Sequence, residues 1–209
     1  MPITINGTGT ITGISAGGLL DGSVTAADIE SSLDLTGKTV TLPSGTGGKI
    51  LQVKHTRYET ATSISTNTSY ADLPFYVAIT PSSTTSSIIV SYSVFHEWSS
   101  TGYQYNSVVS LNRFVGSTNN YLNSGTASNR HTGLVMNYVT YTAGTGSTPG
   151  GIHLVNYVDV PGVTSEVRYY PAVITTGAAT MYINRSMNDT DTAVHERGFS
   201  WITAMEVEL

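Results

Sequence analysis

Between residues 88 and 98 the chain reads Ile-Ile-Val-Ser-Tyr-Ser-Val-Phe-His-Glu-Trp. Apolar and polar side chains alternate here, which places on one face Ile88, Val90, Tyr92, Val94 and Trp98, and on the other Ser91, Ser93 and Glu97. Successive side chains of a β-strand point to opposite faces of its sheet, so this period of two predicts a strand with one buried face.

Further strand-like segments follow one another from residue 49 to the C-terminus. We expect them at residues 50–58, 73–80, 107–115, 134–141, 152–160, 167–174, 181–187 and 199–209. Within two of them we expect shared faces, formed by Ile152, Leu154, Val158 and Val160, and by Phe199, Trp201, Met205, Val207 and Leu209. Gly, Pro, Asn and Ser separate the segments. Many short strands with such turns predict an all-β fold, an antiparallel β-sandwich that is jelly-roll-like.

The composition agrees with an all-β chain that stays in solution through hydroxyl and amide groups. Charged residues make up 11% of the 209 residues, whereas an ordinary soluble domain has about 25%. Thr and Ser supply about a quarter of the chain, and the 13 Tyr outnumber the 4 Phe; Thr and Tyr both favour strands. A net charge of −5 without a basic cluster argues against nucleic-acid binding. Cysteine is absent, which excludes disulfides and thiolate metal sites.

The first 48 residues differ from the rest because they contain no aromatic side chain. One short helix is expected after residue 23, with a thin apolar stripe of Val24, Ile29 and Leu33. Two helical turns are unstable alone in water, so this helix needs partners. We therefore divide the chain into an extended stalk, residues 1–48, for attachment and trimerisation, and a head, residues 49–209. Because the N-terminus lacks a basic segment followed by an apolar one, we expect no signal peptide, and no apolar run is long enough for membrane insertion.

Several segments between residues 8 and 98 resemble modules of bacteriophage fibre proteins, including tail fibres of marine and environmental phages. They are Leu19-Leu20-Asp21-Gly22-Ser23-Val24-Thr25-Ala26-Ala27-Asp28-Ile29, Leu35-Thr36-Gly37-Lys38-Thr39-Val40-Thr41-Leu42-Pro43, Gly48-Lys49-Ile50-Leu51-Gln52-Val53 and the run from Ile79 to Val90. The segment 201–209 is loosely similar, and residues 100–195 resemble no family. The resemblance implies a homotrimer in which three copies of the helix bury Val24, Ile29 and Leu33 against one another.

Loops rich in Tyr and Asn are the candidates for contact with a host receptor. Their residues are Tyr103, Tyr105, Asn119, Asn120, Tyr121, Asn129, Arg130 and His131. An aromatic ring packs on the apolar face of a sugar, and an amide hydrogen-bonds its hydroxyl groups. The alternative is that these are ordinary turns in a Tyr-rich chain.

No metal or cofactor motif is complete. The segment Asn188-Asp189-Thr190-Asp191, followed by Glu196, offers oxygen ligands but lacks the spacing and the Gly of an EF-hand, so we favour a solvated loop. An ion on a threefold axis, bound by one His from each chain, stays open for His131, His153 and His195. Gly37-Lys38-Thr39 ends like a phosphate-binding loop, but Ser32 replaces its first Gly. We predict no cofactor.

The function that we expect is that of a structural virion protein of a bacteriophage, assembled in the bacterial cytoplasm. It would be a trimeric fibre that contacts other virion proteins through residues 1–48 and a host-cell glycan or protein through its head. Two alternatives stay open: a capsid decoration or head-fibre protein that stabilises the particle, and a glycan depolymerase tailspike. A depolymerase needs two carboxylates across a cleft, and the sequence pairs none, so we expect no enzyme. A cellular adhesin is disfavoured because no export signal is expected.

Overall fold

The computed structural model describes residues 49–99, 106–123, 126–136 and 149–208. They belong to a compact unit that spans Gly47–Leu209. Residues 1–48 lie outside the described residues, and with them the expected stalk, its short helix and the stripe of Val24, Ile29 and Leu33. The division at residue 48 therefore stays a prediction.

The described chain is all-β, and every strand pairing in it is antiparallel. The strands are β1 (Lys49–Tyr58), β2 (Thr62–Thr66), β3 (Ala71–Asp72), β4 (Val77–Ile79), β5 (Ser87–Trp98), β6 (Ser107–Val115), β7 (Thr118–Leu122), β8 (Thr126–Ala127), β9 (Arg130–His131), β10 (Val135–Met136), β11 (Gly150–Asp159), β12 (Val167–Thr175), β13 (Ala179–Ile183) and β14 (Ser200–Glu208). The expected strand at 88–98 is confirmed as β5.

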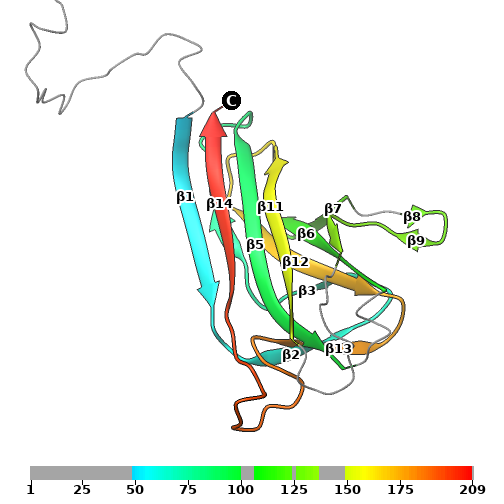
Figure 1. The fold of residues 1–209 in the computed structure, drawn as a ribbon. Coiled ribbons are helices and arrows are strands. Elements are labelled where there is room, and N and C mark those ends of the chain that lie inside the picture. The colour runs from blue at the N-terminus through cyan, green and yellow to red at the C-terminus, as the bar shows by residue number, and fades with distance from the viewer. Residues whose placement is uncertain (1–48, 100–105, 124–125, 137–148, 209) are drawn as a thin grey trace, which may run out of the picture. The chain divides into compact units, whose positions relative to one another are not determined.

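Sheet A is built around β5. Residues 88–93 of β5 pair with β14 on one side and with β11 on the other. On the same side as β14, residues 96–98 of β5 pair with β13. On the far side of β14 and β13 lie β1 and β2. Figure 1 shows β1, β14, β5 and β11 side by side. Sheet A thus has four columns of strands.

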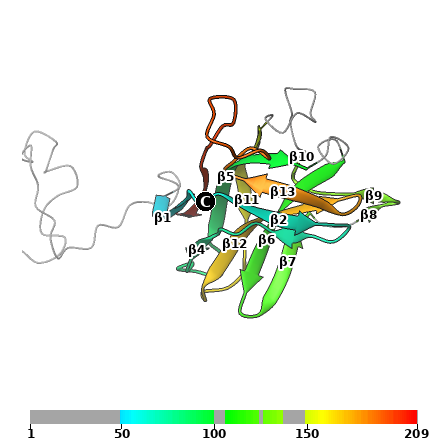
Figure 2. The ribbon, with the colours of Figure 1, turned by 90° about the horizontal axis from the view of Figure 1, so that it is seen from below.

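Sheet B has four columns as well. Its centre is the pair of β6 and β12, which is continuous from residue 107 to residue 115. The strands β4 and β3 share the outer edge of β12, while β7 and β10 share the outer edge of β6. Figure 2 shows β12, β6 and β7 side by side, seen from below.

The order of these columns is that of a jelly roll. Numbered in chain order, the eight columns are β1/β2, β3/β4, β5, β6, β7/β10, β11, β12 and β13/β14. In this numbering the columns of sheet A lie side by side in the order 1, 8, 3, 6, and those of sheet B in the order 2, 7, 4, 5. This is the double-sheet arrangement of two Greek keys that viral capsid and lectin domains share. The expected antiparallel, jelly-roll-like sandwich is therefore confirmed.

The core lies between the two sheets and is one cluster of apolar side chains. From β5 it receives Ile88, Val90, Tyr92, Val94 and Trp98, which are 0–2% exposed, as the alternation predicts. Sheet B contributes residues such as Leu111, Tyr169 and Val173, each fully buried. Each Å² of apolar surface that is buried stabilises the folded state by about 25 cal/mol, so this cluster is the main source of stability of the fold.

Two predicted faces are wrong. In β11 the residues Ile152 and Leu154 are buried, but Val158 is 49% exposed, and Val160, just after the strand, is 54% exposed. The cause is a bulge between Leu154 and Tyr157, where Asn156 has a positive φ of 55°. One extra residue reverses the faces of the strand beyond it.

In β14 the buried face is formed by the even-numbered residues. Ser200, Ile202, Ala204 and Glu206 are fully buried, whereas Phe199 is 47% exposed and Trp201 and Met205 are half-buried. Val207 is also buried, and Leu209 lies outside the described residues. The alternation is therefore real, but the buried face is the one that contains Ser200 and Glu206, whose polar groups find hydrogen-bond partners there.

Two of the predicted strands differ from the structure by several residues. The segment 181–187 ends as a strand at Ile183, because Asn184 adopts a positive φ of 61°. The segment 73–80 is a strand only over Val77–Ile79. Of the segment 134–141 the structure describes residues 134–136, which include the strand Val135–Met136, and residues 137–141 lie outside the described part.

Candidate functional site

A strip of aromatic and amide side chains lies on the face of sheet B that points away from the core. Asn112 in β6 is paired with Tyr121 of β7 on one side and with Tyr170 of β12 on the other. In the next row Phe114 is paired with Asn119 and Arg168. Paired residues of neighbouring strands point to the same face, so all six side chains share one surface, which we call the aromatic face.

Two tyrosines stack at one end of the aromatic face. The rings of Tyr70, just before β3, and Tyr121 have centroids 4.7 Å apart and an angle of 14° between their planes. The Tyr70 hydroxyl group donates a hydrogen bond to the carbonyl oxygen of Thr132. Both rings are half-buried, so part of each remains available to a ligand.

Asn112 fixes the polar groups beside these rings. Its side chain is fully buried, and its Nδ2 donates to Asp72 Oδ2 at 2.8 Å and to Asn119 Oδ1 at 2.7 Å. Its Oδ1 accepts from the backbone N–H of Asn120 at 3.0 Å. Because these hydrogen bonds engage both ends of the Asn112 amide, they hold the side chains of Asp72 and Asn119 in place beside the tyrosine rings.

Burial raises the pKa of Asp72, and hydrogen bonds from Asn112 and Tyr121 partly oppose this shift. The pKa of Tyr121 is raised by burial and by the neighbouring Asp72 carboxylate. At neutral pH the Tyr121 hydroxyl therefore keeps its proton and can donate it in a hydrogen bond.

The other half of the aromatic face centres on Tyr170. Its ring lies 4.7 Å from that of Tyr76 and meets the ring of Phe114 edge-on at 6.4 Å. The Arg168 guanidinium lies 5.3 Å from the centre of the Tyr76 ring, and its Nε pairs with Glu166 at 2.7 Å. Beside Phe114 and Arg168 the surface is hollowed by a depression of about 280 Å³.

This arrangement suits the binding of a sugar. Half-exposed rings, including Tyr76 at 38% exposure, offer flat apolar surface to the C–H face of a pyranose. The amide of Asn119 and the charged ends of Arg168 and Glu166 offer donors and acceptors to its hydroxyl groups.

The structure brings only some of the predicted contact residues together. Asn119 and Tyr121 lie on the aromatic face, while Asn120 is paired with Arg113 and points to the opposite side of β7. The remaining described candidates lie in the hairpin of β8 and β9, where Asn129 and Arg130 are exposed and His131 is half-buried. Tyr103 and Tyr105 lie outside the described residues.

Most residues of the site were missed in the sequence: Tyr70, Asp72, Tyr76, Asn112, Phe114, Glu166, Arg168 and Tyr170. They come from separate segments, and strand pairing and ring contacts bring them to one surface. The only signal in the sequence for the tyrosines among them was the excess of Tyr over Phe.

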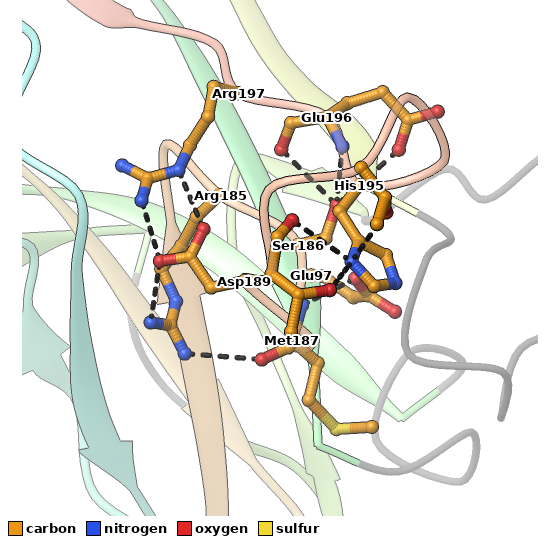
Figure 3. A network of polar contacts seen from close by, with 10 residues as sticks. Glu97, Arg185, Ser186, Met187, Asp189, His195, Glu196 and Arg197 are labelled. Atoms are coloured by element: carbon orange, nitrogen blue, oxygen red, sulfur yellow. Dashed lines mark hydrogen bonds and ion pairs between the residues drawn. The ribbon is translucent and has the colours of Figure 1, made fainter.

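The loop between β13 and β14 is a second organised polar region. In Figure 3 the Asp189 carboxylate lies between two guanidinium groups: Arg197 contacts it at 2.6 Å through both Nε and Nη2, and Arg185 at 3.2 Å. Glu97 accepts a hydrogen bond from the Met187 N–H at 2.7 Å. Both oxygens of Asp189 thus contact guanidinium groups, and the segment 188–191 is part of a loop between two strands.

The three histidines that were considered as ligands of an ion lie on separate elements. His131 is in β9, His153 is exposed in β11, and His195 in the β13–β14 loop contacts Thr190 Oγ1 through Nδ1 at 2.7 Å. Within the ranges that the structure describes, no group of three or more His, Asp or Glu side chains is placed to hold a metal ion. In those same ranges no helix has the length and apolar character needed to cross a membrane.

No known family model matches the sequence, and no characterised protein is significantly similar to it. Among solved structures the fold is similar to the VP2 protein of infectious bursal disease virus in a D431N mutant that forms T=1 particles. That match has a TM-score of 0.36 and 12% identity over 94% of this chain and 54% of the other. The Gt strain of the same virus gives 0.35 and 10% over 81% and 44%. The chain thus spans about half the length of these proteins, and at such scores the likeness says nothing about function.

Proposed function

We propose that the chain is a structural virion protein of a bacteriophage, a homotrimeric fibre whose head binds a glycan on the host surface through the aromatic face. The observation behind glycan binding is the set of half-exposed rings of Tyr70, Tyr76, Tyr121 and Tyr170 around fixed amide and carboxylate groups. The fibre part rests on the resemblance of residues 8–98 to phage fibre modules. A jelly roll suits both the structural role in a virion and the binding of a glycan, because this fold occurs in viral capsid and in lectin domains.

The proposed mechanism is adhesion without a chemical step. Each head contributes one weak contact, and three heads on one fibre raise the effective concentration of the second and third contacts, which gives avidity. Residues 1–48 would connect the fibre to other virion proteins. No cofactor is required for this function.

A glycan array probed with the full-length protein tests the proposal. We expect binding to a restricted set of glycans, and we expect Tyr121→Ala and Tyr170→Ala each to weaken it about threefold to tenfold, as the loss of one ring contact implies. Tyr182→Ala is the matched control, because Tyr182 lies in sheet A beneath the Arg185 guanidinium. Equal binding by all three variants, each shown to be folded by its unfolding midpoint, would contradict the assignment to the aromatic face.

A second candidate, a capsid decoration protein, is favoured by the opposite surface. The outer face of sheet A exposes apolar side chains, among them Val53 at 54%, Val158 at 49% and Phe199 at 47%. Exposed apolar side chains that gather on one surface are typical of contact with another protein. Removal of a decoration protein should weaken the particle, whereas removal of an attachment fibre should block adsorption to the host.

A further inference from the structure

A groove runs along the edge of the sandwich between β1 and the segment Pro74–Ala78. Its volume is about 510 Å³. One wall is the face of β1 that points toward sheet B: Lys54 is paired with Ala204 and Tyr58 with Ser200, and both of these partners are fully buried. Because Lys54 is exposed and Thr56 and Tyr58 are half-buried, these inward side chains of β1 line an open groove instead of the core.

Two contacts across this edge of the sandwich lie on either side of Lys54 along β1. On one side Gln52 Nε2 donates to the carbonyl oxygen of Thr80 at 2.7 Å. On the other side the rings of Tyr58 and Phe75 stack, with centroids 5.2 Å apart and planes at 13°. The groove is therefore a formed feature of the fold, with Lys54 between these two contacts along β1.

Lys54 gives the groove a positive charge that the described residues do not neutralise. The ion pairs among them involve five other cations, and the cation nearest along β1, Arg57, is paired with Glu59 at 2.6 Å. Glu206, two residues from the β14 partner of Lys54, is already occupied by Gln52 and Ser82. The Lys54 ammonium, in an exposed residue, remains available to an anion.

The groove is continuous with the aromatic face through one residue. Tyr76 lines the groove, and its ring also packs against that of Tyr170, with centroids 4.7 Å apart and planes tilted by 36°. A glycan chain that packs on Tyr170 and Tyr76 would therefore place its next sugar in the groove beside Lys54.

We propose that the groove binds a carboxylated sugar, so that the ligand class of this head is an acidic glycan whose carboxylate pairs with Lys54. The positive charge of Lys54 favours a ligand that carries a carboxylate, and the rings of Tyr58 and Tyr76 supply apolar contact to the sugar. This inference rests on the glycan-binding function proposed above and adds the chemical class of the ligand.

Titration of the full-length protein with hexagalacturonate, and with the same oligosaccharide after reduction of its carboxyl groups, tests the proposal. The wild type should prefer the acidic form, and Lys54→Gln should weaken binding of that form about threefold to fivefold, as expected for an exposed ion pair. The reduced form should bind both proteins equally. Lys49→Gln is the matched control, since Lys49 is an exposed residue of the same strand and does not line the groove.

The outcomes separate the two proposals. If the protein binds the reduced form as well as the acidic one and Lys54→Gln changes nothing, the acidic subsite is overturned while glycan binding stands. If neither this pair nor any glycan of the array binds, both proposals fail. If Lys54→Gln changes the mass measured by light scattering and the oligosaccharides do not bind, a second copy of the chain fills the groove, which also overturns the proposal.

Discussion

Glu206 shows how a polar residue can belong to the buried face of a strand. Its carboxylate is fully buried in β14 and accepts hydrogen bonds from Gln52 Nε2 at 2.5 Å and from the N–H and Oγ of Ser82 at 2.7 and 2.6 Å. Burial alone would raise the pKa of Glu206, but the bonds from Gln52, Ser82 and Ser86 outweigh it and lower the pKa to about 2.

This lowered pKa predicts how stability depends on pH. A carboxyl group whose pKa is lower in the folded state than its ordinary value of 4.5 stabilises the fold above that value and loses its effect as the pH falls toward 2. Glu206→Gln should lower the free energy of unfolding by about 1–3 kcal/mol at pH 7, because its amide nitrogen replaces one acceptor oxygen and then faces a donor, either Gln52 Nε2 or the N–H and Oγ of Ser82. Denaturant unfolding between pH 7 and pH 3 should show a smaller loss of stability with acid in this variant.

The control for that experiment is Glu208→Gln, which alters an exposed residue at the end of the same strand. We expect it to change stability by less than about 0.5 kcal/mol. Parallel pH profiles for the wild type and Glu206→Gln would contradict the role assigned to Glu206.

A second buried charge connects the two sheets. Arg113 of β6 pairs with Asp159 of β11 at 2.8 Å, and the buried Tyr169 hydroxyl donates to the same carboxylate at 2.7 Å. The exposed fractions of the Arg113 and Asp159 side chains are 20% and 7%. Arg113→Met should cost about 3 kcal/mol, because it leaves a buried carboxylate without its counter-charge.

Chemical denaturation measures this cost against Arg57→Met. The ion pair of Arg57 with Glu59 is exposed, at 57% and 65%, so its loss should cost less than about 1 kcal/mol. The double variant Arg113→Met/Asp159→Asn should recover part of the stability that Arg113→Met loses. No recovery would show that packing of the Arg113 side chain, and not its charge, accounts for the effect.

At the scale of elements, the sequence predicts the strands whose apolar alternation is clear and misses those built from Ser, Thr and Asn. β5 was predicted with its buried face, whereas β2 and β7 have too few apolar side chains to stand out. The reversed face of β11 depends on the bulge at Asn156, which the apolar pattern does not show. Only Asn119 and Tyr121 of the site were found, because they are close neighbours in sequence, whereas Tyr170 joins them through strand pairing and Tyr70 through ring stacking.

The β13–β14 loop gives a prediction about one element. Asp189 pairs with Arg185 and Arg197 and so joins the two ends of the loop. Asp189→Asn should increase hydrogen exchange and proteolytic cleavage within residues 185–197, because two charge-assisted contacts are weakened. Asp191→Asn, an exposed change in the same loop, is the control and should leave both rates unchanged. Equal rates in the two variants would show that the ion pairs do not order the loop.

At the scale of the whole molecule, the two outer faces of the sandwich differ in chemistry. Sheet B presents the aromatic face with its fixed amide and carboxylate groups, and sheet A presents exposed Val53, Val158 and Phe199. The aromatic face suits the proposed glycan binding. The apolar face suits contact with another protein, either a second head of a fibre or the surface of a capsid.

Trimer formation is the prediction that belongs to the complete chain. Light scattering on a sizing column should give a mass near three times 22.1 kDa. Val24→Asn/Ile29→Asn/Leu33→Asn should reduce it to a single chain, because polar side chains in the expected stripe remove the apolar contact between helices. The unfolding midpoint of the head should not change. Ser31→Asn/Ser32→Asn, outside the stripe, should keep the trimer. A monodisperse monomer for the unaltered chain would contradict the stalk and leave the head as a single binding module, whose glycan contacts would then act without avidity.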